Sequence, residues 1–125
     1  MNFHTIFNHS LTPKQKQDAI NSFGVTEFVQ LPESLQTLWS NIPPDLNDIS
    51  TYLEPLKKYL QKVIKLNDIV LVQGDFGATC QIATFVKSLG AKAVYATTKR
   101  DVVEIKKGDK IEKKSIFEHV KFREY

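Results

Sequence analysis

Apolar and polar residues alternate along the chain with two different periods, and these periods predict its secondary structure. Short apolar runs rich in β-branched and aromatic residues indicate strands, and apolar residues three and four positions apart indicate helices. The predicted strands are Phe3–Phe7, Thr26–Leu31, Asp68–Gln73 and Lys92–Ala96. The predicted helices are Pro13–Phe23, Pro32–Ile42, Leu46–Leu66 and Gln81–Leu89. Such an alternation of strands and helices is typical of an α/β fold.

Local signals predict where some of these elements begin and how they are buried. Thr12 with Gln15 three residues later forms a capping box at the start of a helix. Pro55 lies inside the longest helical pattern, so we expect that helix to begin near Leu53–Leu56 or, as the alternative, to be kinked at Pro55. The run Ile69–Val72 is continuously apolar, which predicts a central strand buried on both faces.

The C-terminal third predicts a loop followed by a β-hairpin. We expect Thr97–Arg100 to form a loop after the fourth strand. Val102–Ile105 and Lys110–Lys114 then flank the turn Lys107-Gly108-Asp109 as two strands. The whole order predicts one domain, residues 1–125, with a small Rossmann-like parallel sheet flanked by helices and a C-terminal hairpin.

The last segment has its own alternation. If residues 115–125 form a strand, its apolar side chains lie on one side and its basic side chains on the other. The expected basic side holds His119, Lys121 and Arg123, opposite Val120 and Phe122.

Composition narrows the classes of protein that this sequence fits. Of 125 residues 42% are apolar and only ten are Gly or Pro, which favours a folded domain over a disordered one. No apolar run approaches about 18 residues and no signal-peptide pattern follows Met1, so we expect a cytoplasmic protein without membrane contact. Cys80 is the only cysteine and the three histidines share no ligand spacing, so no metal or other cofactor is expected.

The net charge of +3 is unevenly distributed. The segment Lys87–Tyr125 holds 11 basic and 6 acidic residues, whereas the rest of the chain is slightly acidic. A positive region of this kind attracts a polyanion such as a nucleotide. The alternative is that the hairpin lysines only protect an exposed edge strand from pairing with other chains.

Three polar loops follow predicted strands, which is where ligands bind in open α/β sheets. The backbone of Gly74–Thr79 offers a cradle for a phosphate, Lys99 and Arg100 offer positive charge, and the imidazole of His9 can transfer protons. The alternatives are a tight turn capped by Asp75 or Thr79, a surface turn at Thr97–Arg100, and a helix-capping role for His9. The expected ligand-binding residues are Asn8, Ser10, Gly74, Asp75, Phe76, Gly77, Ala78, Thr79, Thr97 and Thr98, with His9, Lys99 and Arg100 as catalytic residues.

Two other residues have plainer interpretations. Cys80 stands near the start of a predicted helix, and we expect it to be a small buried residue rather than a reactive thiol. Trp39 lies on an apolar helical stripe, so we expect a core anchor rather than a platform for a nucleobase.

Five segments of the chain are more specific than these general patterns. They are Phe7–Thr12, Leu38–Pro44, Val72–Thr79, Val94–Arg100 and Phe117–Arg123, of which Gln73-Gly74-Asp75-Phe76-Gly77-Ala78-Thr79 and Ala96-Thr97-Thr98-Lys99-Arg100 are the most distinctive. Together they resemble a family of small CRISPR-associated accessory proteins that accompany type III systems. That family is related to the CRISPR-associated Rossmann-fold (CARF) group, and the resemblance spans residues 3–125.

The resemblance implies a homodimer that binds a cyclic oligoadenylate, and the expected ring is cyclic tetra-adenylate. The protein would linearise this ring and so switch off type III CRISPR signalling. Such a ring nuclease needs no metal if a ribose 2′-hydroxyl attacks the adjacent phosphate. No long nucleic acid is expected as a partner. Two alternatives stay open: a sponge or sensor that binds the ring without cleavage, and a protein-interaction module that uses the basic hairpin.

Overall fold

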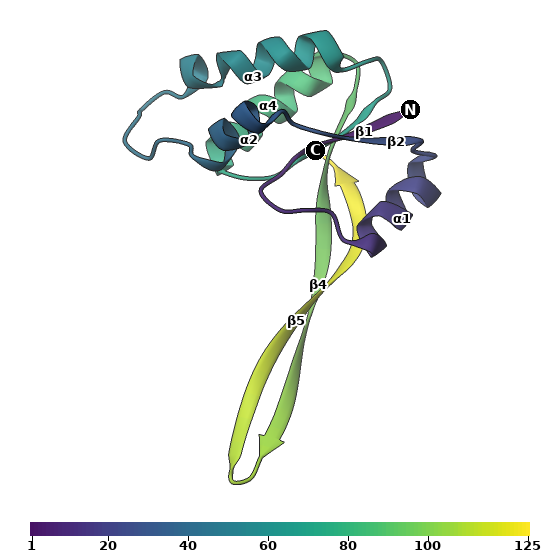
Figure 1. The fold of residues 1–125 in the computed structure, drawn as a ribbon, viewed down its shortest axis with the longest axis vertical. Coiled ribbons are helices and arrows are strands. Elements are labelled where there is room, and N and C mark those ends of the chain that lie inside the picture. Colours follow the sequence, from purple (N-terminus) through teal and green to yellow (C-terminus); the bar gives the residue numbers. More distant parts are fainter.

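The computed structural model describes all residues 1–125 and contains five strands and four helices (Figure 1). In chain order these are β1 (Asn2–Ile6), α1 (Pro13–Phe23), β2 (Glu27–Gln30), α2 (Glu33–Ser40), α3 (Ser50–Val63), β3 (Ile69–Val72), α4 (Phe76–Ser88), β4 (Lys92–Lys107) and β5 (Lys110–Glu124). None of the helices combines the length and the apolar character needed to cross a membrane.

The five strands form one mixed sheet in the order β2-β1-β3-β4-β5. The first four strands of this order are mutually parallel, and β5 pairs antiparallel with β4. The predicted α/β fold with flanking helices and a C-terminal hairpin is therefore confirmed, but the sheet is mixed rather than parallel. The reason is the short connection around Gly108 (φ +60°), because only an antiparallel pair can be joined by so few residues.

Helices cover both faces of the sheet. Helix α1 lies on one face, where its Ala19 packs in a cluster with Phe3, Leu71 and Phe122. Helices α2, α3 and α4 lie on the other face and bury Trp39 and their aliphatic side chains against the sheet (Figure 1). All four residues of β3 are buried, which confirms the predicted central strand.

Two helix starts differ from the prediction. Helix α3 begins at Ser50 and contains Pro55, because burial of its apolar stripe outweighs the one backbone hydrogen bond that proline cannot donate. Pro55 lies on the exposed side, where water can reach the backbone. Helix α4 begins at Phe76 instead of Gln81, because the carboxylate of Asp75 accepts a hydrogen bond from the Ala78 backbone N–H (3.0 Å) and caps the helix there.

The predicted loop Thr97–Arg100 is wrong, because these residues continue β4 without a break. They stay extended because each pairs with a residue of β5, and a bulge interrupts this pairing between Thr97 and Thr98. Thr97 pairs with Lys121 and Thr98 with His119, so Val120 is the extra residue. The bulge reverses the alternation and puts His119 on the buried side with Phe122, their ring centroids 4.7 Å apart. The predicted alternation of the last strand is therefore wrong for His119, which lies on the same side as Phe122 instead of with Lys121 and Arg123.

Beyond the bulge the hairpin leaves the rest of the molecule as a long two-stranded ribbon (Figure 1). We call residues 99–118 the arm and the remainder the body. The arm holds seven basic and five acidic residues. Its six large apolar side chains are all 38% or more exposed: Val102, Val103, Ile105, Ile111, Ile116 and Phe117. Nothing in the same chain covers them.

Candidate functional site

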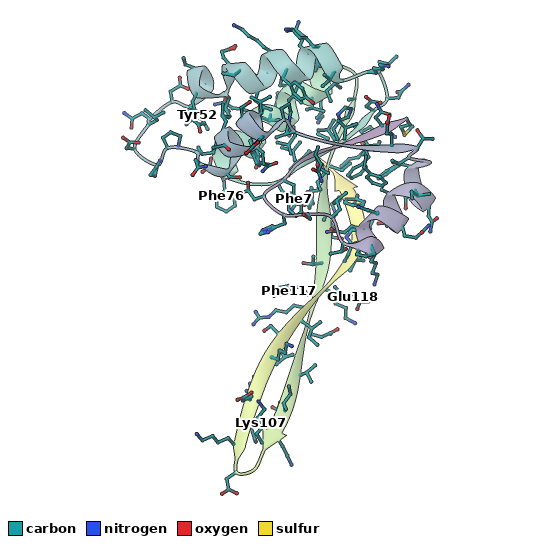
Figure 2. The ribbon with its side chains drawn as sticks, in the orientation of Figure 1. Phe7, Tyr52, Phe76, Lys107, Phe117 and Glu118 are labelled. Atoms are coloured by element: carbon teal, nitrogen blue, oxygen red, sulfur yellow. The ribbon has the colours of Figure 1, made fainter.

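The loops singled out from the sequence lie at one edge of the sheet. Ile6 at the end of β1 pairs with Val72 at the end of β3, and Leu71 pairs with Val94 of β4. The carboxyl ends of these strands therefore coincide, and the arm leaves from the same edge. Figure 2 shows Phe7 and Phe76 near this edge and Lys107 at the far end of the arm. The strand order also reverses between β1 and β3, which is where open α/β sheets bind ligands.

A cavity of about 590 Å³ opens beside the end of β1. Its walls come from the β1–α1 loop, the first turns of α1, the end of β2, and α2. It is lined by Thr5, Phe7, Asn8, His9, Ser10, Leu11, Lys16, Phe28, Gln30, Gln36 and Ser40. We call it the polar cavity, because most of these side chains can donate or accept hydrogen bonds.

Hydrogen bonds hold one wall of the polar cavity in place. Ser40 Oγ donates to Asn8 Oδ1 (3.0 Å), and Gln36 Nε2 donates to the backbone oxygen of Phe7 (3.0 Å). The exposed ring of His9 packs edge-on against Phe7, with ring centroids 5.3 Å apart. No group of the chain bonds to the imidazole, so both of its nitrogens can meet a ligand.

The structure adds a cation that the sequence reasoning missed. Lys16 lines the polar cavity because α1 begins beside it. The predicted capping box is confirmed: Gln15 N–H donates to Thr12 Oγ1 (3.2 Å), and Thr12 N–H donates to Gln15 Oε1 (2.9 Å). Lys16 is in the turn fixed by this cap. Gln30 was also missed, although its place at the end of the second parallel strand is a signal that could have revealed it.

The segment Gly74–Thr79 does not form one cradle. Gly74, Phe76 and Thr79 line a second cavity of about 430 Å³, whereas Asp75 and Gly77 line a third of about 310 Å³. The predicted phosphate cradle is also partly occupied, because the Asp75 carboxylate takes the Ala78 N–H and the Asp75 carbonyl takes the Thr79 N–H (2.8 Å). Ala78 itself is fully buried. The alternative interpretation, a tight turn capped by Asp75, describes this segment better.

Gly74 has a structural reason to be glycine. A Cβ atom there would lie 2.8 to 2.9 Å from the indole of Trp39. That indole is buried and donates from Nε1 to the backbone oxygen of Gln73 (3.0 Å). The prediction that Trp39 anchors the core is confirmed, and its ring explains the glycine without a ligand.

The second cavity is mostly aromatic and apolar, and we call it the aromatic slot. It is lined by Gln73, Gly74, Phe76, Thr79, Cys80, Tyr95 and Tyr125. Burial raises the pKa of the Tyr125 phenol, and the neighbouring Tyr95 raises it further. Cys80 is exposed, so its predicted burial is wrong. The reason is helical phase, since Ala78 and Ile82 face the sheet on either side of it.

The residues at the base of the arm stand apart from these cavities. Thr97 Oγ1 donates to the Lys121 backbone oxygen (3.0 Å) and accepts from its N–H (3.2 Å), so this hydroxyl is used within the bulge. Arg100 donates from Nε and Nη2 to Ser115 Oγ (3.3 and 3.1 Å). Lys99 Nζ lies 4.0 Å from Asp101 Oδ1. Neither these three residues nor Thr98 lines the three cavities.

The buried His119 and the partly buried Asp18 link the base of the arm to α1. His119 Nε2 lies 2.7 Å from Asp18 Oδ2. Burial alone would raise the pKa of Asp18, but hydrogen bonds from Ser22 and His119 and the nearby charges of His119 and Lys121 hold it below its usual value. Because α1 also borders the polar cavity, this contact joins the base of the arm to a helix that lines that cavity.

Comparison with known proteins gives the family. The profile of the "Uncharacterized protein MJ1673 family" matches residues 1–123. This chain belongs to the MJ1673 family. A relative from Methanocaldococcus jannaschii, "Uncharacterized protein MJ1673", is 48% identical over 120 residues, which cover 96% of this chain and 93% of the relative. No solved structure matches the chain significantly.

Proposed function

We propose that this MJ1673-family protein is a ring nuclease that binds cyclic tetra-adenylate in the cytoplasm and linearises it to switch off type III CRISPR signalling. The observation that carries the proposal is the polar cavity at the carboxyl edge of the sheet, where the free imidazole of His9 and the ammonium of Lys16 line one space. The strand order β2-β1-β3-β4, with helices on both faces, supports a Rossmann-like sheet related to the CARF group.

The proposed reaction is an internal transfer at phosphorus. A ribose 2′-oxygen bonds to the adjacent phosphorus, the bond from phosphorus to the 5′-oxygen breaks, and the product is a linear adenylate with a 2′,3′-cyclic phosphate. His9 takes the 2′-hydroxyl proton or returns one to the leaving oxygen. Lys16 offsets the charge that develops on the phosphate, and Asn8 and Ser10 orient its oxygens or those of the ribose. Since the nucleophile belongs to the ligand, this mechanism needs no metal.

The proposal includes a homodimer. A cavity of about 590 Å³ is the size of a site for one small molecule, so one protomer would hold only part of a ring of four adenylates. The arm leaves from the edge that holds the polar cavity and can hold a second copy that faces this edge. Its apolar side chains would then be covered, and Lys99 and Arg100 would neutralise phosphates outside the cavity.

The test is to incubate the protein with cyclic tetra-adenylate, with and without EDTA, and to separate the products by chromatography. We expect a linear product at the same rate in both cases. His9→Ala should lower the rate at least about 100-fold, because it removes the proton-transfer group. Arg100→Ala should weaken the binding of cyclic tetra-adenylate. The matched control is Lys107→Ala, which removes a positive charge at the far end of the arm and should leave this binding unchanged. A strict requirement for a divalent ion would refute the mechanism.

The cleavage assay distinguishes the first alternative, and charge reversal in the arm distinguishes the second. A ring that is bound tightly but returned intact would show a sponge or sensor. The exposed arm favours the other alternative, a protein-interaction module. In that case charge reversal at the arm lysines would abolish binding of the partner protein, while His9→Ala would not. These lysines are Lys106, Lys107, Lys113 and Lys114.

A further inference from the structure

The aromatic slot contains a side chain that the fold does not explain. Phe76, the first residue of α4, is 95% exposed, more than any other large apolar side chain of the protein. Packing gives no reason for a phenyl ring here, because the ring contacts almost nothing and displaces water at a cost. Figure 2 shows it projecting from the edge of the body. A ring that projects beside a cavity offers a flat surface on which another planar group can stack.

The other rings of the slot are held in place. Tyr95 and Tyr125 pack against each other with ring centroids 4.9 Å apart, and the Tyr125 hydroxyl donates to the backbone oxygen of Val72. Arg123 Nη1 donates to the Tyr95 hydroxyl (2.9 Å), and its guanidinium carbon lies 5.5 Å from the centre of that ring. A ligand that enters the slot therefore meets a wall that is already ordered, which lowers the entropic cost of binding.

One polar group of the slot is free and has a fixed orientation. Gln73 Oε1 accepts a hydrogen bond from the Ala96 backbone N–H (2.8 Å). The side-chain amide is therefore oriented, and its Nε2 carries two N–H groups that no group of the chain accepts. Gln73 thus presents a hydrogen-bond donor rather than an acceptor to the cavity that it lines. The matching ligand is a flat ring with an acceptor atom at its edge.

We propose that the aromatic slot binds a purine base, which stacks on Phe76 and Tyr95 and accepts a hydrogen bond from Gln73 Nε2. A purine has a large π-face and ring nitrogens that accept hydrogen bonds. The slot volume of about 430 Å³ is within the range of about 300 to 1,000 Å³ for small-molecule sites. This inference rests on the proposed function only for the source of the purine, which would be one adenine of the cyclic ligand.

The slot can be tested without the cyclic ligand. Adenosine, guanosine and cytidine 5′-monophosphates are titrated separately into the ¹⁵N-labelled protein, and the amide signals are followed by NMR. We expect adenosine monophosphate to shift the signals of Gly74, Cys80 and Tyr95, and cytidine monophosphate to shift them at a higher concentration. Phe76→Ala should weaken binding about tenfold through lost stacking, whereas Phe76→Trp should keep it. Both variants should fold, because the ring is exposed.

Several outcomes would overturn the purine slot. They are no shift at these amides up to millimolar nucleotide, shifts confined to His9 and its neighbours, equal binding by Phe76→Ala, or equal affinity for all three nucleotides. Preference for guanosine over adenosine would keep the purine slot but exclude adenylate as its source.

The failure of this inference can be distinguished from that of the proposed function. If adenosine monophosphate binds the slot but cyclic tetra-adenylate is returned intact, the purine slot is supported and the proposed nuclease activity is refuted. If the ring is cleaved and Phe76→Ala leaves KM unchanged, the nuclease activity is supported, and the slot does not bind an adenine of the cyclic ligand.

Discussion

The body and the arm are made of the same kinds of residue but differ in what surrounds them. Val94 and Val102 belong to the same strand, β4, yet Val94 is fully buried and Val102 is 56% exposed. Helix α1 and the sheet enclose the first valine, while only the partner strand lies beside the second. Apolar spacing along a strand therefore does not tell whether the strand is covered.

This difference assigns separate tasks to the two regions. The body holds both apolar clusters and provides the stability of the protomer. A two-stranded ribbon in water is only marginally stable, so the arm depends on its own pairing and on whatever covers it. Stability should respond to changes in the body, and association should respond to changes in the arm.

The largest expected effect comes from a cavity in the body. Leu56→Ala removes a fully buried side chain of α3 and should lower the free energy of unfolding by about 2–5 kcal/mol, measured by urea denaturation. The matched change in the arm, Ile116→Ala, shortens a side chain that is 45% exposed and should change it by less than about 0.5 kcal/mol. Equal losses would end the distinction between body and arm.

A smaller loss is expected where the body is crowded. Gly74→Ala places a Cβ against the Trp39 indole and should cost about 1–3 kcal/mol in the same denaturation experiment. The control is Gly77→Ala, in the first turn of α4, where the nearest atom would be 3.6 Å away. Because alanine favours a helix over glycine, the control should be as stable as wild type or slightly more stable. A Gly74→Ala protein of unchanged stability would contradict the tight packing on Trp39.

Acid should destabilise the body through Asp68. Burial would raise the pKa of this carboxyl, but hydrogen bonds from the Lys65 N–H, the His4 side chain and the Asn2 N–H hold it below its usual value. Its stabilisation is complete above the unfolded pKa of about 3.8 and is lost as the pH falls through the lower folded pKa. Thermal unfolding should therefore show a falling Tm below about pH 4.

The Asp68→Asn protein tests this assignment. It should unfold at a lower temperature than wild type at neutral pH and lose less of its Tm in acid, because the shifted carboxyl is gone. The control Asp45→Asn removes an exposed carboxyl without a hydrogen-bond partner and should keep the wild-type profile. An unchanged acid profile in Asp68→Asn would assign the acid sensitivity to other groups.

Shortening the arm should separate association from stability. Replacing residues 102–115 by an Asn-Gly turn keeps the pairing at the base of the arm and closes it with a favoured two-residue loop. At high dilution the free energy of unfolding should change by less than about 1 kcal/mol, since no helix packs on the removed residues. Light scattering should show loss of the proposed dimer. A large loss of stability in the monomer would mean that the arm supports its own body.

The smallest effect is expected for the exposed ion pair at the base of the arm. Lys14 and Glu118 are both more than half exposed, so Lys14→Ala should leave the Tm unchanged within error. Asp18→Asn, which removes the partner of the buried His119, should lower the Tm measurably. If Lys14→Ala had the larger effect, the exposed ion pair rather than the His119–Asp18 contact would hold the base of the arm to α1.

Part of the candidate site could be predicted from the sequence. Asn8, His9 and Ser10 lie together because they are consecutive residues at the end of a strand that the local pattern already indicates. Lys16 and Gln36 come from two different helices, and their meeting at this cavity depends on how those helices pack. The loops predicted to form one site do not line one cavity. Asn8, His9 and Ser10 line the polar cavity, Gly74 and Thr79 line the aromatic slot, and residues 97–100 line none of the three cavities because they continue β4.

The sequence by itself determined the features that act over one turn or one strand. These are the capped helix α1, the buried strand β3 and the hairpin turn at Gly108. Caps, apolar periods and turn residues act on neighbours a few positions away and can be read directly. Only the tertiary structure decided the bulge at Val120 and the exposed arm. Each of these depends on which surfaces are covered, and coverage is set by residues far apart in the chain.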